Sequence, residues 1–136
     1  MPVIFQSIVA QGRDFPRVSG CAGDVVTHRA TVTLPTAGAA GDLLEIAILP
    51  ARHVLVSIRE VDAGTIQVAK VGIMAGDVGD TNVANRAVGT ALVASGREAD
   101  AAFAVTPVEY DRSIGAQLTS ANAGASVTLI LTYSQG

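Results

Sequence analysis

The chain has 136 residues, which corresponds to one domain that buries roughly two-thirds of the surface of its unfolded chain. Hydrophobic residues make up 49% and charged residues 15% of the chain, and this balance excludes a disordered protein. The net charge of −3 provides no basic surface for a phosphate backbone, so nucleic acid is not an expected partner.

Period-two alternation of apolar and polar residues recurs along the chain between clusters of Gly, Pro, Asp and Asn. Helical periodicity is nearly absent, although "SGREADAAFAV" leaves room for one helical turn. This spacing predicts an all-β sandwich or barrel. The expected strands are Val3–Ala10, Val25–Leu34, Asp42–Leu49, His53–Val61, Ile66–Met74, Arg86–Val93, Ala101–Val105, Arg112–Thr119 and Ser126–Tyr133.

The N-terminal segment is rich in turn formers, as in "QGRDFPRVSG". We expect an arm over residues 1–20 that leads into a single β-sandwich domain over residues 21–136. No basic segment precedes the short apolar run and no stretch approaches the ~18 apolar residues of a membrane span, so synthesis in the cytoplasm is expected. The single cysteine, Cys21, cannot form an intrachain disulfide and is interpreted as a small, wholly or partly buried thiol.

The strand expected at Val25–Leu34 alternates clearly. Its apolar face includes His28, which is interpreted as a core or interface histidine, and its other face is expected to be exposed to water. The first face comprises Val26, His28, Ala30, Val32 and Leu34, and the second comprises Thr27, Arg29, Thr31 and Thr33.

The stretch "GDLLEIAILPARHVLVSIREVDAG" is interpreted as a hairpin with its tip at Leu49–His53. In that register Ile48 faces Val54, Ile46 faces Val56 and Leu44 faces Ile58, which gives an apolar side for the core. The other side is half apolar, which is unusual for the solvent face of a lone monomer. It carries Leu43, Glu45, Ala47 and Leu49 on one strand and His53, Leu55, Ser57, Arg59 and Val61 on the other. Either the N-terminal arm or another protein is expected to cover this side, and Glu45 and Arg59 are close enough to pair.

The last two expected strands are interpreted as a second antiparallel pair. Placing Leu118 opposite Val127 makes one apolar face and leaves Arg112 opposite Tyr133, where a cation–π contact is expected. The same register brings two further apolar pairs together, Ala116 with Leu129 and Ile114 with Leu131.

No catalytic or metal-binding pattern emerges from the reactive residues. His28 and His53 are the only imidazoles and belong to no zinc or iron motif, while His53 beside a turn is expected to be solvated. Asp77–Asn85 contains oxygen ligands of the kind that Ca²⁺ prefers, but its spacing favours a loop held by Asx turns. The acidic residues around Ala99 and Tyr110 lack the aromatic platform of a glycosidase. We expect no enzyme activity, no cofactor and no metal.

The segment Gly41–Ile73, which ends in "IQVAKVGI", resembles the capsid cement (decoration) proteins of tailed bacteriophages. There a Gly-Asp strand, a Leu-Pro-Ala turn, a Val-rich strand and a Val-Gly strand recur. The resemblance implies a jelly-roll sandwich of about eight strands that forms a homodimer. It also implies a place on the capsid exterior, where the protein binds the outer surface of an icosahedral shell and clamps neighbouring subunits of the major capsid protein.

The contacts with these partners are expected on the arm and on the second side of the hairpin. The arm is expected to add a strand to the sheet edge of a neighbour. The hypothesised interface residues are Ile4, Phe5, Ile8, Phe15, Pro16, Leu43, Glu45, Leu55 and Arg59.

A second hypothesis is a ligand- or sugar-binding β-sandwich module of a phage tail or receptor-binding structure. Such a module needs a concave site with aromatic side chains. The rings available for it are Phe5, Phe15, Phe103, Tyr110 and Tyr133.

Overall fold

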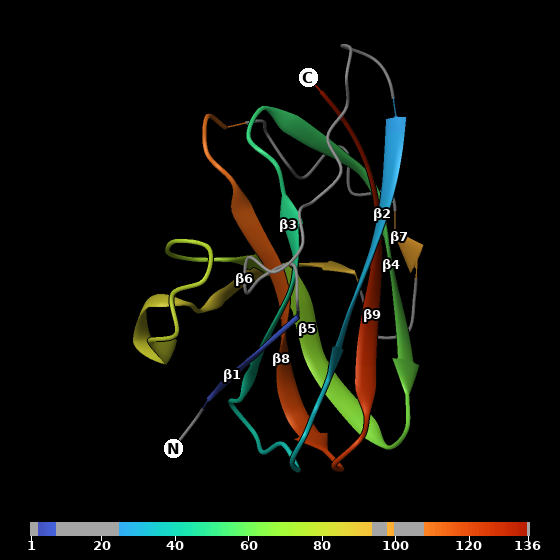
Figure 1. Cartoon of the computed structure of the whole chain (residues 1–136), viewed down its shortest axis with the longest axis vertical. Helices are drawn as coiled ribbons and strands as arrows, with labels where there is room; N and C mark the ends of the chain where they lie inside the picture. Colours follow the sequence, from blue (N-terminus) through green and yellow to red (C-terminus); the bar gives the residue numbers. More distant parts are fainter. Residues whose placement is uncertain (1–2, 8–24, 94–97, 100–107, 136) are drawn as a thin grey trace.

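The computed structural model describes residues 3–7, 25–93, 98–99 and 108–135. In these residues two β-sheets pack face to face as a sandwich (Figure 1). Sheet A has five strands in the order β1-β3-β8-β5-β6, and sheet B has four in the order β2-β9-β4-β7. The strands are β1 (Ile4–Gln6), β2 (Val25–Thr33), β3 (Leu43–Leu49), β4 (His53–Ala63), β5 (Ile66–Met74), β6 (Val88–Val93), β7 (Glu98–Ala99), β8 (Arg112–Ala121) and β9 (Ser126–Gln135).

Strands β2 to β9 have the connectivity of a jelly roll. From β2 to β5 each strand lies in the opposite sheet from the one before it. Strands β5 and β6 share sheet A, and from β6 to β9 successive strands again alternate between the sheets. The result is two four-stranded antiparallel units, β2-β9-β4-β7 and β3-β8-β5-β6. Two interleaved Greek keys of this kind define a jelly roll, so the predicted fold class is confirmed.

The expected strand positions agree well with those observed. Ile66–Met74 matches β5 at both ends, and β2, β3, β4, β8 and β9 begin within one residue of their predicted starts. The strand expected at Ala101–Val105 lies outside the described residues. The short strand β7 has no counterpart among the expected strands and falls in the segment where the sequence leaves room for a helical turn.

The two predicted hairpins are wrong. Strand β3 lies in sheet A and β4 in sheet B, so Leu44 pairs with Ala116 and Ile58 with Leu131. In the same way β8 and β9 lie in different sheets, and Tyr133 is opposite Leu55 instead of Arg112. Two strands that face each other across a sandwich bury the same alternate residues as two hydrogen-bonded strands would. The apolar pattern therefore identifies the inner face of each strand and leaves its partner undetermined.

The core lies between the two sheets. The alternation predicted for β2 is confirmed, because its apolar face is buried from His28 onward and its threonines point outward. The fully buried members of the core include Leu34, Leu44, Ile46, Leu49, Leu55, Ile58, Ile114, Leu129, Leu131 and Tyr133. No helix in the described part of the chain has the length and apolar content needed to cross a membrane.

The first described residues add a short parallel strand to the edge of sheet A. Ile4 pairs with Leu43 and Gln6 with Glu45 of the same chain. The backbone amide of Leu43 donates to the Val3 carbonyl at 2.9 Å, and the Ser7 hydroxyl donates to the Ile46 carbonyl. This strand covers the edge of β3 that the sheet would otherwise leave open. The predicted boundary between arm and domain, at residue 20, lies outside the described residues.

Candidate interaction surfaces

The loop that joins β5 to β6 folds back onto the outer face of sheet A. It contains the 3₁₀ turn η1 (Val83–Asn85), which Asn82 caps by accepting a hydrogen bond from the Ala84 amide. Beneath it, Leu43, Met74 and Val88 form a small hydrophobic cluster outside the main core. Every residue of β3 is therefore buried, because the core covers one of its faces and this loop with β1 covers the other.

A buried charge pair joins this loop to the sheet. Glu45 and Arg86 are both fully buried, and Arg86 Nη2 lies 2.6 Å from Glu45 Oε2. The Ser113 hydroxyl on β8 also donates to the same carboxylate oxygen and accepts from Arg86 Nη2 at 2.6 Å. A buried ion pair persists only where hydrogen bonds satisfy both of its members, and the surroundings supply them.

The charge pair also binds the backbone of the loop and the side chain of Gln6 in β1. Arg86 Nε donates to the Ala75 carbonyl at 2.7 Å, and Nη1 donates to the Asp80 carbonyl at 2.9 Å. Glu45 accepts from the Gly79 amide at 3.0 Å and from Gln6 Nε2 at 2.7 Å. The pair thus fastens β1, β3, β8 and the loop into one unit, and its atoms are engaged in structural contacts.

The expected partner of Glu45 is wrong. Arg59 lies on β4 in the other sheet, with its side chain exposed. The true partner, Arg86, is 41 residues away, where the sequence predicts the start of a strand. No local pattern identifies it, since the pairing arises only when the β5–β6 loop folds over sheet A.

The acidic loop residues make turn hydrogen bonds, as the loop interpretation predicted. Asp80 accepts from the Asn82 amide at 2.9 Å and from Asn85 Nδ2 at 3.1 Å. The hydrogen bond from Asn82, followed by the one from Asn85, lowers the pKa of Asp80 below its ordinary value of 3.8. Among the described residues, no three His, Cys, Asp or Glu side chains gather closely enough to hold a metal ion.

This geometry predicts how the loop responds to acid. Because the folded-state pKa of Asp80 lies below that of the unfolded chain, its hydrogen bonds contribute stability above pH 3.8 that is lost as the pH falls through the folded pKa. A carboxyl-detected NMR titration is expected to give Asp80 a midpoint below 3.8, and Asn85→Ala is expected to raise that midpoint. A wild-type midpoint at or above 3.8 would contradict the assigned hydrogen bonds.

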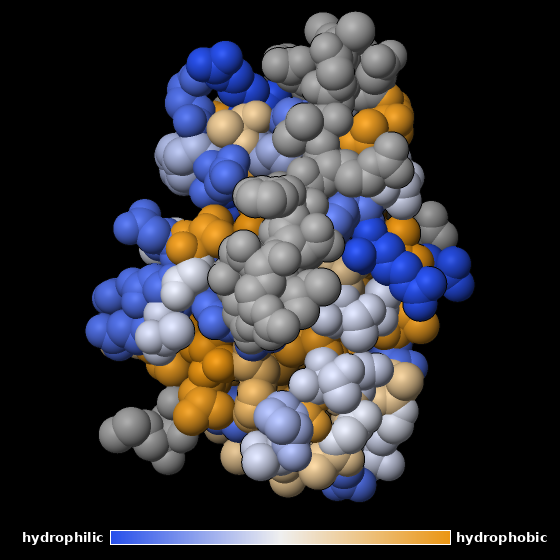
Figure 2. Space-filling model, viewed as in Figure 1, coloured by the Kyte–Doolittle hydropathy of each residue, from blue (hydrophilic) through white to orange (hydrophobic). Residues whose placement is uncertain are grey.

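The outer face of sheet B is rich in hydroxyl groups, and we call it the threonine face. Thr31 Oγ1 lies 2.8 Å from Thr128 Oγ1, and Thr27 Oγ1 lies 3.3 Å from Thr132 Oγ1. Figure 2 shows residues of intermediate hydropathy along the lower part of β2 and hydrophilic residues across its middle, while hydrophobic residues gather low on the left, where Figure 1 places β1 and β3. The threonine face comprises Thr27, Arg29, Thr31 and Thr33 of β2, Thr128, Ile130 and Thr132 of β9, and Ser57, Arg59 and Val61 of β4.

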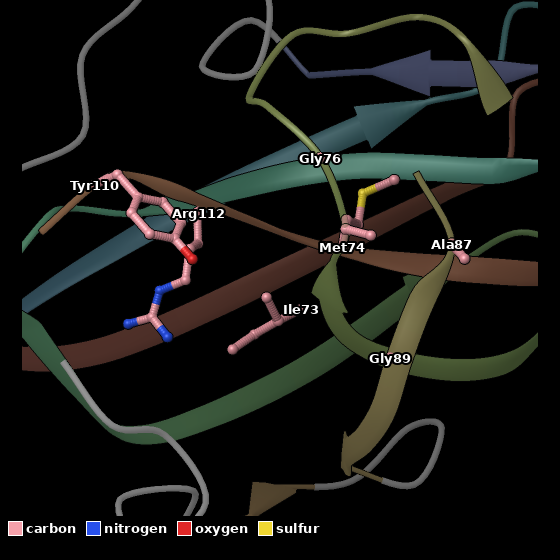
Figure 3. Close-up of a pocket in the computed structure, with 8 residues that line it drawn as sticks. Ile73, Met74, Gly76, Ala87, Gly89, Tyr110 and Arg112 are labelled. Carbon is pink, nitrogen blue, oxygen red and sulfur yellow. The ribbon is translucent and has the colours of Figure 1, made fainter. Parts of the chain in front are cut away.

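A pocket of about 290 Å³ opens where the end of β5, the start of β6 and the start of β8 meet. Figure 3 shows the Arg112 side chain extending toward Ile73, with Tyr110 beside it. Tyr110 is 64% exposed, whereas Arg112 is half-buried. The other lining residues are Met74, Ala75, Gly76, Ala87 and Gly89.

The predicted interface residues fall into three groups. Leu43, Glu45 and Leu55 are buried within the single chain: β1 and the β5–β6 loop cover Leu43 and Glu45, in line with the intrachain alternative, and Leu55 lies in the main core. Ile4 and Phe5 are half-buried in β1, and Arg59 is exposed on the threonine face. Ile8, Phe15 and Pro16 lie outside the described residues.

The residues weighed for chemistry are engaged in packing and turns. His53 is only 4% exposed and packs edge-on against the Tyr133 ring at 5.4 Å, so the expectation that it is solvated is wrong. Asp111 Oδ1 accepts from the Ala51 amide at 2.8 Å, and Glu109 forms an exposed ion pair with Arg52, also at 2.8 Å. These bonds hold the turn that enters β4.

Comparison with solved structures identifies a similar chain from a virus particle. The match is described as "Capsid of Ralstonia phage GP4", with a TM-score of 0.83 and 36% sequence identity over 98% of each chain. No protein-family model matches this chain, and no curated protein matches it. The similarity extends through both sheets, since almost the whole length of both chains is covered.

Proposed function

The chain belongs to a family of bacteriophage capsid proteins, and from this membership we propose that it is a cement, or decoration, protein. In this role it binds the outer surface of an icosahedral shell and stabilises the contacts between subunits of the major capsid protein. The observation that carries the proposal is the similarity to a capsid chain over 98% of both chains. The protein would be made in the host cytoplasm and act without catalysis on the capsid exterior.

The threonine face is the surface that we assign to the shell. Strands β2, β9 and β4 form it side by side, and the exposed threonines of β2 offer hydrogen-bond donors and acceptors at every second residue, while Thr128 of β9 is buried. Ile130 lies between Arg29 and Arg59 in one cross-strand row, so an apolar centre is flanked by two positive charges. A half-polar surface of this kind suits a contact that is weak in each copy and repeated over a shell.

The arm and self-association complete the proposal. In the single chain β1 already occupies the edge of its own β3, so addition of the arm to a neighbour would require β1 to leave that position. We propose that contacts of the arm with a neighbour come from the residues that follow β1, including the hypothesised Ile8, Phe15 and Pro16. We also propose a homodimer, which light scattering of the purified protein would detect as twice the chain mass of 13.8 kDa.

The described aromatic residues give little support to a sugar-binding module. Tyr133 is fully buried, Phe5 is half-buried against the main core and Tyr110 is exposed. Phe15 and Phe103 lie outside the described residues. A platform for sugar rings needs several aromatic faces directed toward one site, and the three described rings do not share one.

A shell-binding experiment tests the proposed function. Purified protein mixed with capsids lacking it is expected to co-sediment with them and to give ordered density on their outer surface in cryo-electron microscopy, with the threonine face toward the shell. We expect Thr31→Glu to weaken co-sedimentation by about tenfold or more, because an unpaired carboxylate would be desolvated in the contact. Absence of binding by the wild-type protein would overturn the proposed function.

A matched variant distinguishes the effect of the location from the effect of the Thr→Glu change itself. Thr119 is an exposed threonine on β8 in sheet A, so Thr119→Glu makes the same chemical change on the opposite side of the sandwich. It is expected to bind shells as the wild type does. Thr31→Glu loses the hydroxyl contact with Thr128 and is expected to melt somewhat below the wild type, so binding is compared at a temperature at which both variants are folded. Equal binding by Thr31→Glu and Thr119→Glu would refute the threonine face as the contact while leaving shell binding itself intact.

A further inference from the structure

The pocket beside Arg112 contains hydrogen-bond donors that the protein itself does not satisfy. Arg112 is the first residue of β8, and its Nε and Nη2 atoms are buried without a hydrogen-bond partner. Of the described residues that line the pocket, only Tyr110 carries a side-chain hydroxyl or carboxylate, and neither nitrogen bonds to it. Leaving such charged donors unpaired costs folding free energy.

The other buried or paired arginines show what Arg112 lacks. Arg86 has partners on all three of its nitrogens, including the Glu45 carboxylate. Arg52 pairs with Glu109 at the surface. Burial, as the largest cause, lowers the pKa of Arg112, but a guanidinium stays protonated at neutral pH. Arg112 is thus a half-buried positive charge on the wall of the pocket, with two donors that no described group satisfies.

The ligand that fits these groups is a carboxylate. The planar guanidinium offers two parallel N–H donors, which match the two oxygens of an Asp or Glu side chain. The walls formed by Ile73, Met74 and Ala87 suit the methylene groups that precede that carboxylate. Tyr110, exposed at the rim, provides an aromatic surface of the type that anchors protein contacts.

We propose that this pocket receives an acidic side chain of a neighbouring major capsid protein subunit. The identity of the partner rests on the proposed function, and the preference for a carboxylate rests on the charge of the pocket. The pocket is built on sheet A, whereas the threonine face belongs to sheet B. The two surfaces therefore let one copy hold two neighbours, which is what a clamp between capsid subunits requires.

Titration with sodium acetate tests the pocket without any shell. Acetate is expected to shift the Arg112 Nε–H resonance and the amide resonances of Gly76 and Gly89 in a saturable manner, with sodium chloride at equal ionic strength as the control. Arg112→Gln should abolish the saturable shift, because it removes the charge and the paired donors. A linear response, or an equal response at Arg52, would overturn the pocket as a carboxylate site.

Shell binding then tests the partner. Arg112→Gln is expected to weaken co-sedimentation with capsids by about tenfold or more, and Arg112→Lys is expected to restore only part of it, because lysine keeps the charge and loses the bidentate geometry. Arg52→Gln, which removes an arginine that already has an acidic partner, is expected to bind as the wild type does.

The outcomes are distinguishable. Acetate saturation with unchanged shell binding by Arg112→Gln would overturn the capsid subunit as the partner, and an acetate-sensitive dimer mass would then assign the carboxylate to a second copy. Failure of the wild-type protein to bind shells would overturn the proposed function and this partner together. Weakened binding by Arg112→Gln at an unchanged melting temperature supports the proposal.

Discussion

Arg86→Ala is expected to lower the free energy of unfolding by about 3–5 kcal/mol, which is a large part of the stability of a domain of this size. The substitution leaves the Glu45 carboxylate fully buried without its counter-charge, and it also frees the Ala75 and Asp80 carbonyls of the loop. Equilibrium unfolding in urea measures the change, provided that the slope of the transition stays constant.

The exposed ion pair provides the matched control. Arg52→Ala removes an arginine–carboxylate contact at 2.8 Å, close to the 2.6 Å of the buried pair, but both of its side chains are mostly exposed. It is expected to cost about 0–1 kcal/mol. The double variant Arg86→Ala with Glu45→Gln should recover part of the loss, since it removes the buried charge. Equal effects of Arg86→Ala and Arg52→Ala would show that the buried pair does not form in solution.

Gly115→Ala is expected to destabilise the fold by more than about 3 kcal/mol, or to prevent folding. Gly115 lies on β8 between Glu45 of β3 and Gly72 of β5. A methyl group there would lie 2.1 Å from the Leu44 carbonyl oxygen and 2.5 Å from Met74 Sδ. The Leu44 oxygen belongs to the backbone of β3, so it cannot move away without disturbing the β3–β8 pairing. The soluble yield and the melting temperature are the measurements.

Gly89→Ala is the corresponding control, since it adds the same methyl group in β6, two strands away from β8 in the same sheet. There the methyl group would meet only the Ile73 carbonyl oxygen, at 3.2 Å, which a small displacement relieves. We expect a loss of about 1 kcal/mol or less. Equal melting temperatures for the Gly115→Ala and Gly89→Ala proteins would contradict the close approach of β8 to β3.

The sequence predicted the strands and their inner faces because both depend on local patterns. Thr27, Arg29, Thr31 and Thr33 alternate with the residues of the core, and the outward face of β2 follows directly. The partners of each strand depend on long connections that carry no comparable pattern. That is why the sequence predicts a hairpin of β3 and β4 at Pro50, although this segment crosses from one sheet to the other.

The candidate sites were less predictable than the fold. The sequence predicts Arg59 as the partner of Glu45, but the true partner, Arg86, reaches it only through the folded β5–β6 loop. Arg112 was expected to contact Tyr133, whereas its guanidinium lies in a pocket that three strands of sheet A create together. Sites assembled from residues that are distant in the chain need the topology before their chemistry can be read.

The composition of the threonine face lowers the side-chain entropy that is lost on binding. A threonine side chain has one main torsion, and branching at Cβ restricts it in the free protein, so little rotamer entropy remains to be lost on contact. A long lysine or arginine forfeits about 1.5–2 kcal/mol when it is immobilised. A sheet surface with mostly hydroxyl side chains can thus bind with little loss of side-chain entropy, and this holds for every copy on the shell.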